Sequence, residues 1–145
     1  MLFRSNGRFH NILIGYDGSE ESKKALDLAL AIANTMDAKL TVMSVTRPPE
    51  PAILPELHAV IDESQEGCAG ELRKISETAR RSGIGVKTIC AVGHPAEQIV
   101  RRADEDRIDL IILGRRGTGT FAKLVLGSVS EQVLKYASCP VLVTT

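Results

Sequence analysis

The stretch DLIILGRRGTGTFAKLVLGSVSEQVLKYA, residues 109–137, decides the fold. Its first six residues, DLIILG, form an apolar run that no polar residue interrupts, which predicts a central strand. Residues 128–137 carry apolar side chains at helical spacing, and Pro140 ends the helix that they predict. The connection between strand and helix is rich in glycine and contains Arg115 and Arg116. A strand joined to a helix by such a connection suggests a phosphate cradle in an α/β fold.

The rest of the chain repeats this alternation. Further short apolar runs predict strands at residues 11–16, 40–45, 86–92 and 141–145. Apolar side chains at helical spacing predict helices after Ser19 to Met36, from Leu57 to about Gly83, and from Pro95 to Ala103. Strict alternation of strand and helix predicts a parallel sheet with helices on both faces. We find no internal repeat, and residues 1–145 are expected to form a single domain.

This architecture predicts where a ligand would bind. In open parallel sheets, ligands bind beyond the carboxyl ends of the strands, where the direction of winding reverses. The runs at 11–16 and 109–114 are the most uniformly apolar, so we expect them to be neighbours in the middle of the sheet. Asp17 follows the first run, and the glycine-rich stretch 114–128 follows the second. Both should therefore flank one crevice.

The composition limits the partners of this crevice. The 145 residues have a formal net charge of zero, and aromatic residues make up 3% of them. A chain without a basic field is not expected to bind nucleic acid or a membrane, so any anion site must be local. No apolar run is long enough to span a bilayer, and the N-terminal residues lack the apolar segment of a signal peptide. We therefore expect a cytoplasmic protein.

The cysteines suggest no special chemistry. Cys68, Cys90 and Cys139 are odd in number and scattered, and no pair of them has the spacing of metal ligands. We expect all three to be buried thiols without a redox role.

Two familiar phosphate-binding templates do not fit the glycine-rich stretch. A P-loop requires glycine, four residues and then Gly-Lys-Ser/Thr, but counted from Gly114 the template places Thr120 where the lysine is needed. The dinucleotide fingerprint Gly-x-Gly-x-x-Gly/Ala is matched by Gly117, Gly119 and Ala122. This match follows the fourth predicted strand, and too little chain remains for the acidic ribose partner, so we do not favour it.

A third template fits completely. It reads Gly, two residues, Gly, nine residues, Gly, Ser/Thr, and here it is met by Gly114, Gly117, Gly127 and Ser128. This is the ATP-binding signature of the universal stress protein family, which the sequence resembles from end to end. The segments NILIGYDGSEES, VGHPAEQIV and GSVSEQVLKYASCPVLV look like the family's usual segments. The resemblance implies a Rossmann-like, adenine nucleotide alpha hydrolase-like fold with strand order 3-2-1-4-5, in one universal stress protein domain over residues 1–145.

The signature also suits a phosphate for physical reasons. Gly114 and Gly117 lack side chains, so their backbone N–H groups can approach phosphate oxygens closely. Ser128 stands where the next helix begins. The exposed N–H groups of Ser128, Val129 and Ser130, together with the helix dipole, favour an anion.

Two features of the stretch have more than one interpretation. Ser128 and Glu131 have the spacing of a capping box, so Ser128 could be a plain N-cap without a ligand. The signature does not include Arg115 and Arg116, which could neutralise phosphates or simply be solvated.

The resemblance implies roles for three further residues. Asp17 matches the acidic residue that contacts the nucleoside or its metal, although it could instead cap the next helix. Gly15 stands where the family's backbone approaches the adenine, and Val45 where the backbone reads the adenine edge. The implied ligands are ATP and Mg²⁺ (or Mn²⁺), with Asp17 at the metal.

These observations favour an ATP-binding regulatory protein of a stress response. A slow ATPase or another nucleotide-using enzyme is the alternative, but the sequence offers neither a P-loop lysine nor a catalytic base, so we assign no catalytic residue. An interaction module with an empty site is disfavoured because the signature is intact. The family resemblance also implies a homodimer through the last strand, Val141 to Thr145, whose apolar edge ends the chain.

Overall fold

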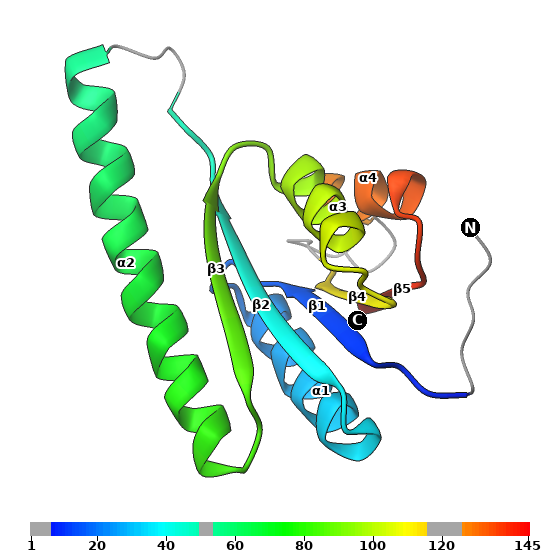
Figure 1. Cartoon of the computed structure of the whole chain (residues 1–145). Helices are drawn as coiled ribbons and strands as arrows, with labels where there is room; N and C mark the ends of the chain where they lie inside the picture. The colour runs from blue at the N-terminus through cyan, green and yellow to red at the C-terminus, as the bar shows by residue number, and fades with distance from the viewer. Residues whose placement is uncertain (1–6, 50–53, 116–125) are drawn as a thin grey trace.

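A single parallel sheet organises the molecule. The computed structural model describes residues 7–49, 54–115 and 126–145. In these residues five parallel strands form one sheet in the order β3-β2-β1-β4-β5 (Figure 1). The strands are β1 (Asn11–Gly15), β2 (Lys39–Thr46), β3 (Val86–Val92), β4 (Leu110–Gly114) and β5 (Val141–Thr144). The α/β class and the strand order expected from the sequence are confirmed.

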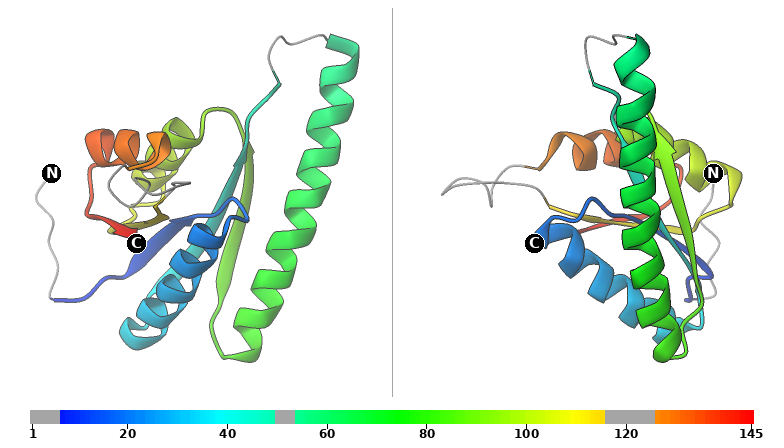
Figure 2. Two further views of the ribbon diagram at one scale, coloured as in Figure 1. Left: turned by 180° about the vertical axis from the view of Figure 1, so that it is seen from behind. Right: turned by 90° about the vertical axis from the view of Figure 1, so that its left-hand side faces the viewer.

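The helices cover both faces of the sheet (Figure 2). Those of the described chain are α1 (Glu20–Met36), α2 (Leu54–Arg81), α3 (Pro95–Glu105) and α4 (Ser128–Tyr136). Side chains of α1 and α2 form the core on one face, and side chains of α3 and α4 form the core on the other. Within the described ranges, no helix is both long enough and apolar enough to cross a membrane.

The two central strands are buried on both faces. In β1, Ile12 and Ile14 point toward α1 and α2, whereas Leu13 points toward α3 and α4. In β4, Ile112 points toward α1 and α2, and Ile111 points toward α3 and α4. All five side chains are fully buried. A strand with a core on each side cannot alternate apolar and polar residues, and this explains the uninterrupted apolar runs.

Local signals in the sequence set the helix starts next to the strands. Ser19 is the N-cap of α1, and its side-chain oxygen accepts a hydrogen bond from the N–H of Ser22 at 3.2 Å. Pro95 is the first residue of α3, where its missing N–H costs nothing. Both starts agree with the expectations from the sequence.

The cysteines differ from expectation. Cys68 in α2 and Cys90 in β3 form a disulfide, while Cys139 is a free thiol. The prediction of three thiols was therefore wrong for two of them, because a separation of 22 residues gives no sign that α2 packs along β3. Cys139 is a thiol as predicted, although it is half-buried: burial, followed by the charges of nearby Asp104 and Asp109, raises its pKa to about 11.

Candidate functional site

A pocket opens at the carboxyl ends of β1, β2 and β4. The winding of the chain reverses at β1, since β2 and β3 lie on one side of it and β4 and β5 on the other. Open parallel sheets bind their ligands at this position. The pocket has a volume of about 210 Å³. Its lining residues are Gly15, Tyr16, Asp17, Ser19, Ser22, Met43, Val45, Arg47, Pro95, Ile99, Leu113, Gly114, Gly127, Val129 and Ser130.

One side of the pocket is the junction between β1 and α1, where side chains satisfy the helix start. Ser19 accepts the N–H of Ser22, and the Ser22 hydroxyl donates to the Ser19 carbonyl at 2.9 Å. Asp17 Oδ1 accepts the N–H of Ser19 at 3.0 Å. Asp17 therefore braces the turn before the helix while Ser19 is the cap, and the exposed carboxylate of Asp17 stays at the pocket.

The opposite side is the start of α4, which is built differently. The N-cap is Gly127, whose carbonyl accepts the N–H of Glu131 at 3.0 Å, and no described side chain caps the helix. The alternative in which Ser128 is the N-cap of a capping box is wrong, since Ser128 is already the first helical residue. The Ser128–Glu131 pattern therefore begins one residue after the N-cap position. Because a glycine N-cap has no side-chain acceptor, the first-turn N–H groups are left to other partners.

Close packing requires the glycines at the ends of both central strands. A Cβ on Gly114 would lie 2.6 Å from the backbone carbonyl atoms of Glu21 and 2.8 Å from the nitrogen of Ser22, in the first turn of α1. A Cβ on Gly15 would lie 2.6 Å from a methyl group of Leu113. The absence of side chains at these positions brings β1, β4 and α1 together around the pocket. Close packing is thus a second reason why position 114 requires a glycine, besides access for a phosphate.

The far end of the pocket is mainly apolar. Met43 and Val45 line it from β2, and Ile99 and Leu113 line it from α3 and β4. Arg47, an exposed residue just after β2, supplies a cation at the rim. An apolar slot with a charged rim suits a flat ring that carries a polar or anionic substituent.

Tyr16, which follows β1, is among the residues that line the pocket, and it is held at two points. Its hydroxyl donates to Oε1 of Glu71 in α2 at 3.0 Å, and its carbonyl accepts the hydroxyl of Ser44 in β2 at 2.6 Å. Burial, then the hydrogen bond and charge of Glu71, raise the pKa of Tyr16 to about 12. Tyr16 is therefore a neutral hydrogen-bond donor at physiological pH.

The described residues offer little to a metal ion by themselves. None of them form a group of three or more His, Cys, Asp or Glu side chains that could hold one. Asp17 is the single carboxylate among the lining residues that the structure describes. Mg²⁺ commonly binds through one or two carboxylates together with substrate phosphates, so Asp17 fits a metal that arrives with a nucleotide and does not fit a resident metal site.

Comparison with known proteins identifies the family. The model of the "Universal stress protein family" matches residues 8–145. The chain belongs to the universal stress protein family. The universal stress protein YxiE of Bacillus subtilis (strain 168) is 35% identical to it over 149 residues, covering 93% of this chain and 98% of that protein.

Solved structures of universal stress proteins resemble the chain over nearly its whole length. Universal stress protein UspA from Lactobacillus plantarum superposes with a TM-score of 0.86 at 30% identity, over 97% of this chain and 100% of that one. A universal stress protein solved in complex with cAMP superposes with a TM-score of 0.70 at 28% identity, over 94% of this chain and 96% of the other. The family assignment therefore extends to the three-dimensional fold.

The pocket of this universal stress protein gathers most of the residues predicted from its sequence. The predicted residues that line it are Gly15, Asp17, Val45, Gly114, Gly127 and Val129. Ser128 lies between two lining residues without lining the pocket itself. Gly117 lies outside the described residues, as does Arg116, so the structure places neither. Arg115 directly follows β4, and its N–H donates to the carbonyl of Thr144 in β5 at 3.0 Å.

Sequence reasoning missed several members of the site. For Ser130 only the backbone N–H was predicted; its buried side chain also lines the pocket, and its hydroxyl donates to the Gly114 carbonyl at 3.4 Å, which ties α4 to the end of β4. Tyr16, Ser22 and Arg47 were also missed. Arg47 could have been found, because it stands two residues after Val45 at the same end of the same strand. Tyr16 could not, since its partner Glu71 is 55 residues away in the sequence.

Proposed function

We propose that this universal stress protein binds ATP with Mg²⁺ (or Mn²⁺) in the pocket and acts as a nucleotide-dependent regulatory protein of a stress response. The observation that carries the proposal is the start of α4 at Gly127. Its first turn reaches the pocket without a side-chain cap, opposite an apolar slot on β2. A helix N-terminus favours phosphate and an apolar slot favours a nucleobase, so the two together suit a nucleotide.

Each part of the nucleotide has a natural partner in the pocket. The apolar side chains of Met43 and Ile99 would cover the adenine ring, and the backbone of Val45 would bind its edge. Asp17 would bind the ribose or the metal. Gly127 and Val129, with the N–H groups of the first turn of α4, would bind the phosphates. The metal, when bound with the nucleotide, would neutralise phosphate charge.

The relative solved in complex with cAMP supports a nucleotide as the ligand but leaves the number of phosphates to be tested. The most direct test is calorimetric titration with ATP, AMP and cAMP, with and without Mg²⁺. We expect the tightest binding for ATP with Mg²⁺. The Gly127→Val variant should lose this binding, because the new side chain would occupy the start of α4. Gly85→Val is the matched control, since a Cβ on Gly85 meets no atom within 4 Å. Absence of ATP binding by the wild-type protein would contradict the proposal.

The role of Asp17 can be tested in the same titration. Asp17→Asn keeps the oxygen that accepts the Ser19 N–H and removes the negative charge. We expect this variant to fold normally and to lose the gain in ATP affinity that Mg²⁺ gives the wild type. An unchanged response to Mg²⁺ would show that the metal is held elsewhere. ADP released during the titration would favour the alternative of a slow ATPase.

The edge of β5 supports the proposed homodimer. The carbonyls of Pro140 and Thr144 accept bonds from Ile111 and Arg115, on the β4 side. Because backbone groups alternate along a strand, the N–H of Val143 points to the open edge. Val143→Pro should therefore remove an inter-subunit donor without touching β4, as proline is tolerated on such an edge. We expect dimers for the wild type and the Val143→Ala control, and monomers for Val143→Pro, in analytical ultracentrifugation.

We also propose that the protein acts in the cytoplasm. In that compartment the disulfide between Cys68 and Cys90 would meet thiol reductants.

A further inference from the structure

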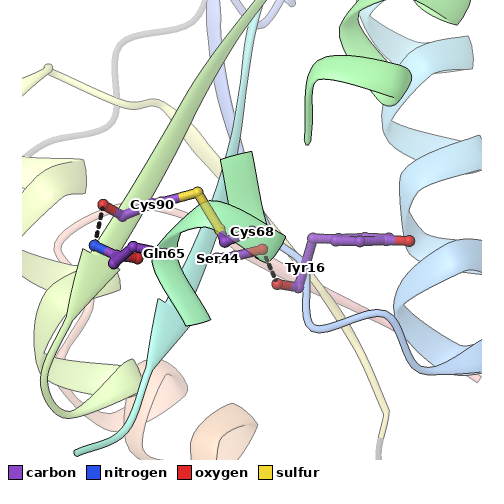
Figure 3. The surroundings of a disulfide bond; sticks show 5 residues. All are labelled: Tyr16, Ser44, Gln65, Cys68 and Cys90. Atoms are coloured by element: carbon purple, nitrogen blue, oxygen red, sulfur yellow. Dashed lines mark hydrogen bonds between the residues drawn. A yellow bond between two sulfur atoms is a disulfide. The ribbon is translucent and has the colours of Figure 1, made fainter. Parts of the chain in front are cut away.

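The disulfide joins the long helix α2 to the sheet at one point. Figure 3 shows Cys68 on α2 bonded to Cys90 on β3, with Gln65 beside them. Both cysteines are partly buried, so a small reductant can reach them. Beyond this point the C-terminal half of α2 is anchored by buried Leu72 and Ala79. The N-terminal half instead exposes residues such as Val60, which makes the disulfide its main attachment.

The contacts of Gln65 show that the non-covalent attachment of α2 to β3 beside the disulfide is weak. Its Nε2 donates to the Cys90 carbonyl at 3.4 Å, a long hydrogen bond. Its Oε1 is buried and has no hydrogen-bond partner in the described chain. A buried unsatisfied acceptor opposes the packing that creates it. The disulfide therefore holds α2 in a position that the neighbouring polar contacts favour only weakly.

Each cysteine lies next to a residue that holds Tyr16. Cys68 is one helical turn before Glu71, which accepts the Tyr16 hydroxyl. Cys90 pairs across the β2–β3 ladder with Ser44, which donates to the Tyr16 carbonyl, as Figure 3 shows. The disulfide thus couples both attachments of a residue that lines the pocket.

We propose that Cys68 and Cys90 form a reversible redox site that controls nucleotide affinity through Tyr16. This inference rests on the proposed nucleotide-binding function. In the disulfide form, α2 and β3 hold Glu71 and Ser44 in place, so Tyr16 is ordered at the pocket. In the dithiol form, the turn of α2 that carries Cys68 and Glu71 loses its covalent tie to β3 and is held only by packing through Leu72, so the contacts of Glu71 and Ser44 with Tyr16 loosen. Binding of the ligand must then restore the order of Tyr16, and the free energy that this costs weakens the affinity.

The chemistry requires a dithiol as reductant. One of its thiolates attacks a sulfur of the disulfide, the S–S bond breaks, and a mixed disulfide forms while the released cysteine takes up a proton. The second thiolate of the reductant then displaces the other cysteine, which is protonated in turn. Two electrons and two protons pass to Cys68 and Cys90, and the reductant leaves as a disulfide. Cys139 cannot take part from within the chain, since it packs in the core on the opposite face of the sheet.

The test compares ATP affinity in the two redox states. Wild-type protein is titrated with ATP and Mg²⁺ after oxidation and after treatment with dithiothreitol, with thiol labelling to count free cysteines. We expect binding to be at least about fivefold weaker after reduction, the lower range of typical coupling between sites. Cys139→Ser is the control and should respond like the wild type. The Cys68→Ser/Cys90→Ser variant should bind like the reduced protein and ignore dithiothreitol.

Several results would overturn the proposal. Equal ATP affinity of the oxidised and reduced proteins would overturn it, provided that labelling proves full reduction. Free thiols at both Cys68 and Cys90 after oxidation would also overturn it. Amide hydrogen exchange without nucleotide separates this failure from that of the proposed function. Reduction should speed exchange at residues 56–71 and at Tyr16, whose N–H is bonded to Met43. If neither form binds ATP, the proposed function is wrong, and with it the control of affinity. If reduction also leaves amide hydrogen exchange unchanged, the disulfide is not coupled to Tyr16.

Discussion

The first turns of α1 and α4 reach the same pocket but are satisfied in different ways. At α1, Ser19 caps the helix and Asp17 braces the preceding turn. At α4, the N-cap is Gly127, and no described side chain replaces the missing cap. Both helices follow central strands and both present small residues to the pocket. The difference lies in whether the chain itself supplies the acceptors for the helix N–H groups.

This difference assigns separate tasks to the two junctions. A capped helix start is worth about 1 kcal/mol of stability and offers few donors to a ligand. An uncapped start is less stable alone and attracts an anion through its free donors and its dipole. We therefore expect the α1 junction to stabilise the fold and the α4 junction to bind the proposed nucleotide. The variants below test this division, beginning with the residue where the two junctions meet.

Gly114→Ala should have the largest effect on stability. The new Cβ would lie 2.6 Å from the backbone of Glu21, which cannot rotate away as a side chain could. We expect a loss of about 3 kcal/mol, at the upper end of the usual cost of overpacking. Urea denaturation measures it, and Gly85→Ala is the control with open space around the new methyl group. Equal stability of the two variants would mean that α1 does not press on the end of β4.

Gly127→Asp should convert the start of α4 into a capped start like that of α1. The backbone of Gly127, at φ −63° and ψ 156°, accepts any residue. The carboxylate would satisfy the helix and repel phosphate, so we expect unchanged or slightly raised stability and ATP affinity reduced more than about tenfold, or 1.4 kcal/mol. Gly127→Asn caps without charge and should reduce affinity less. Calorimetry gives both affinities, and equal losses would attribute the effect to side-chain bulk.

Ser19→Ala should have the opposite pattern and the smallest effect on binding. Removing the cap of α1 should lower stability by about 1 kcal/mol. ATP affinity should change by no more than about twofold, because the α1 start is not expected to bind phosphate. Ser19→Asp retains a capping oxygen and should restore stability. A loss of ATP affinity as large as that of Gly127→Asp would contradict the claim that the start of α4, and not that of α1, binds the phosphates.

The sequence predicted the fold because its signals were local or periodic. The uninterrupted runs of β1 and β4, the cap at Ser19 and Pro95 at the start of α3 each act within a few residues. The positions of Asp17 and of the glycine-rich stretch, each after one of the two central strands, predicted that they would flank one crevice, and Asp17, Gly114 and Gly127 do line one pocket. A parallel sheet aligns the carboxyl ends of its strands, so residues after different strands meet without any direct signal between them.

The features that sequence reasoning missed depend on contacts between distant segments. The disulfide requires α2 to lie along β3, and the second attachment of Tyr16 requires Glu71 from the same helix. The error at Ser128 had another cause. A capping-box pattern fixes the spacing of two residues but not the exact residue at which the helix begins, and here Gly127 takes the capping position.

The most direct test of the division between the two junctions is a backbone ¹⁵N–¹H spectrum recorded with and without ATP and Mg²⁺. The largest shifts should fall on the amides of Val129 and Ser130 at the start of α4. The amides of Glu21 and Ser22 at the start of α1, where the Ser22 N–H is already bonded to Ser19, should shift little. Larger shifts at the start of α1 than at the start of α4, or no shift at either, would contradict the account.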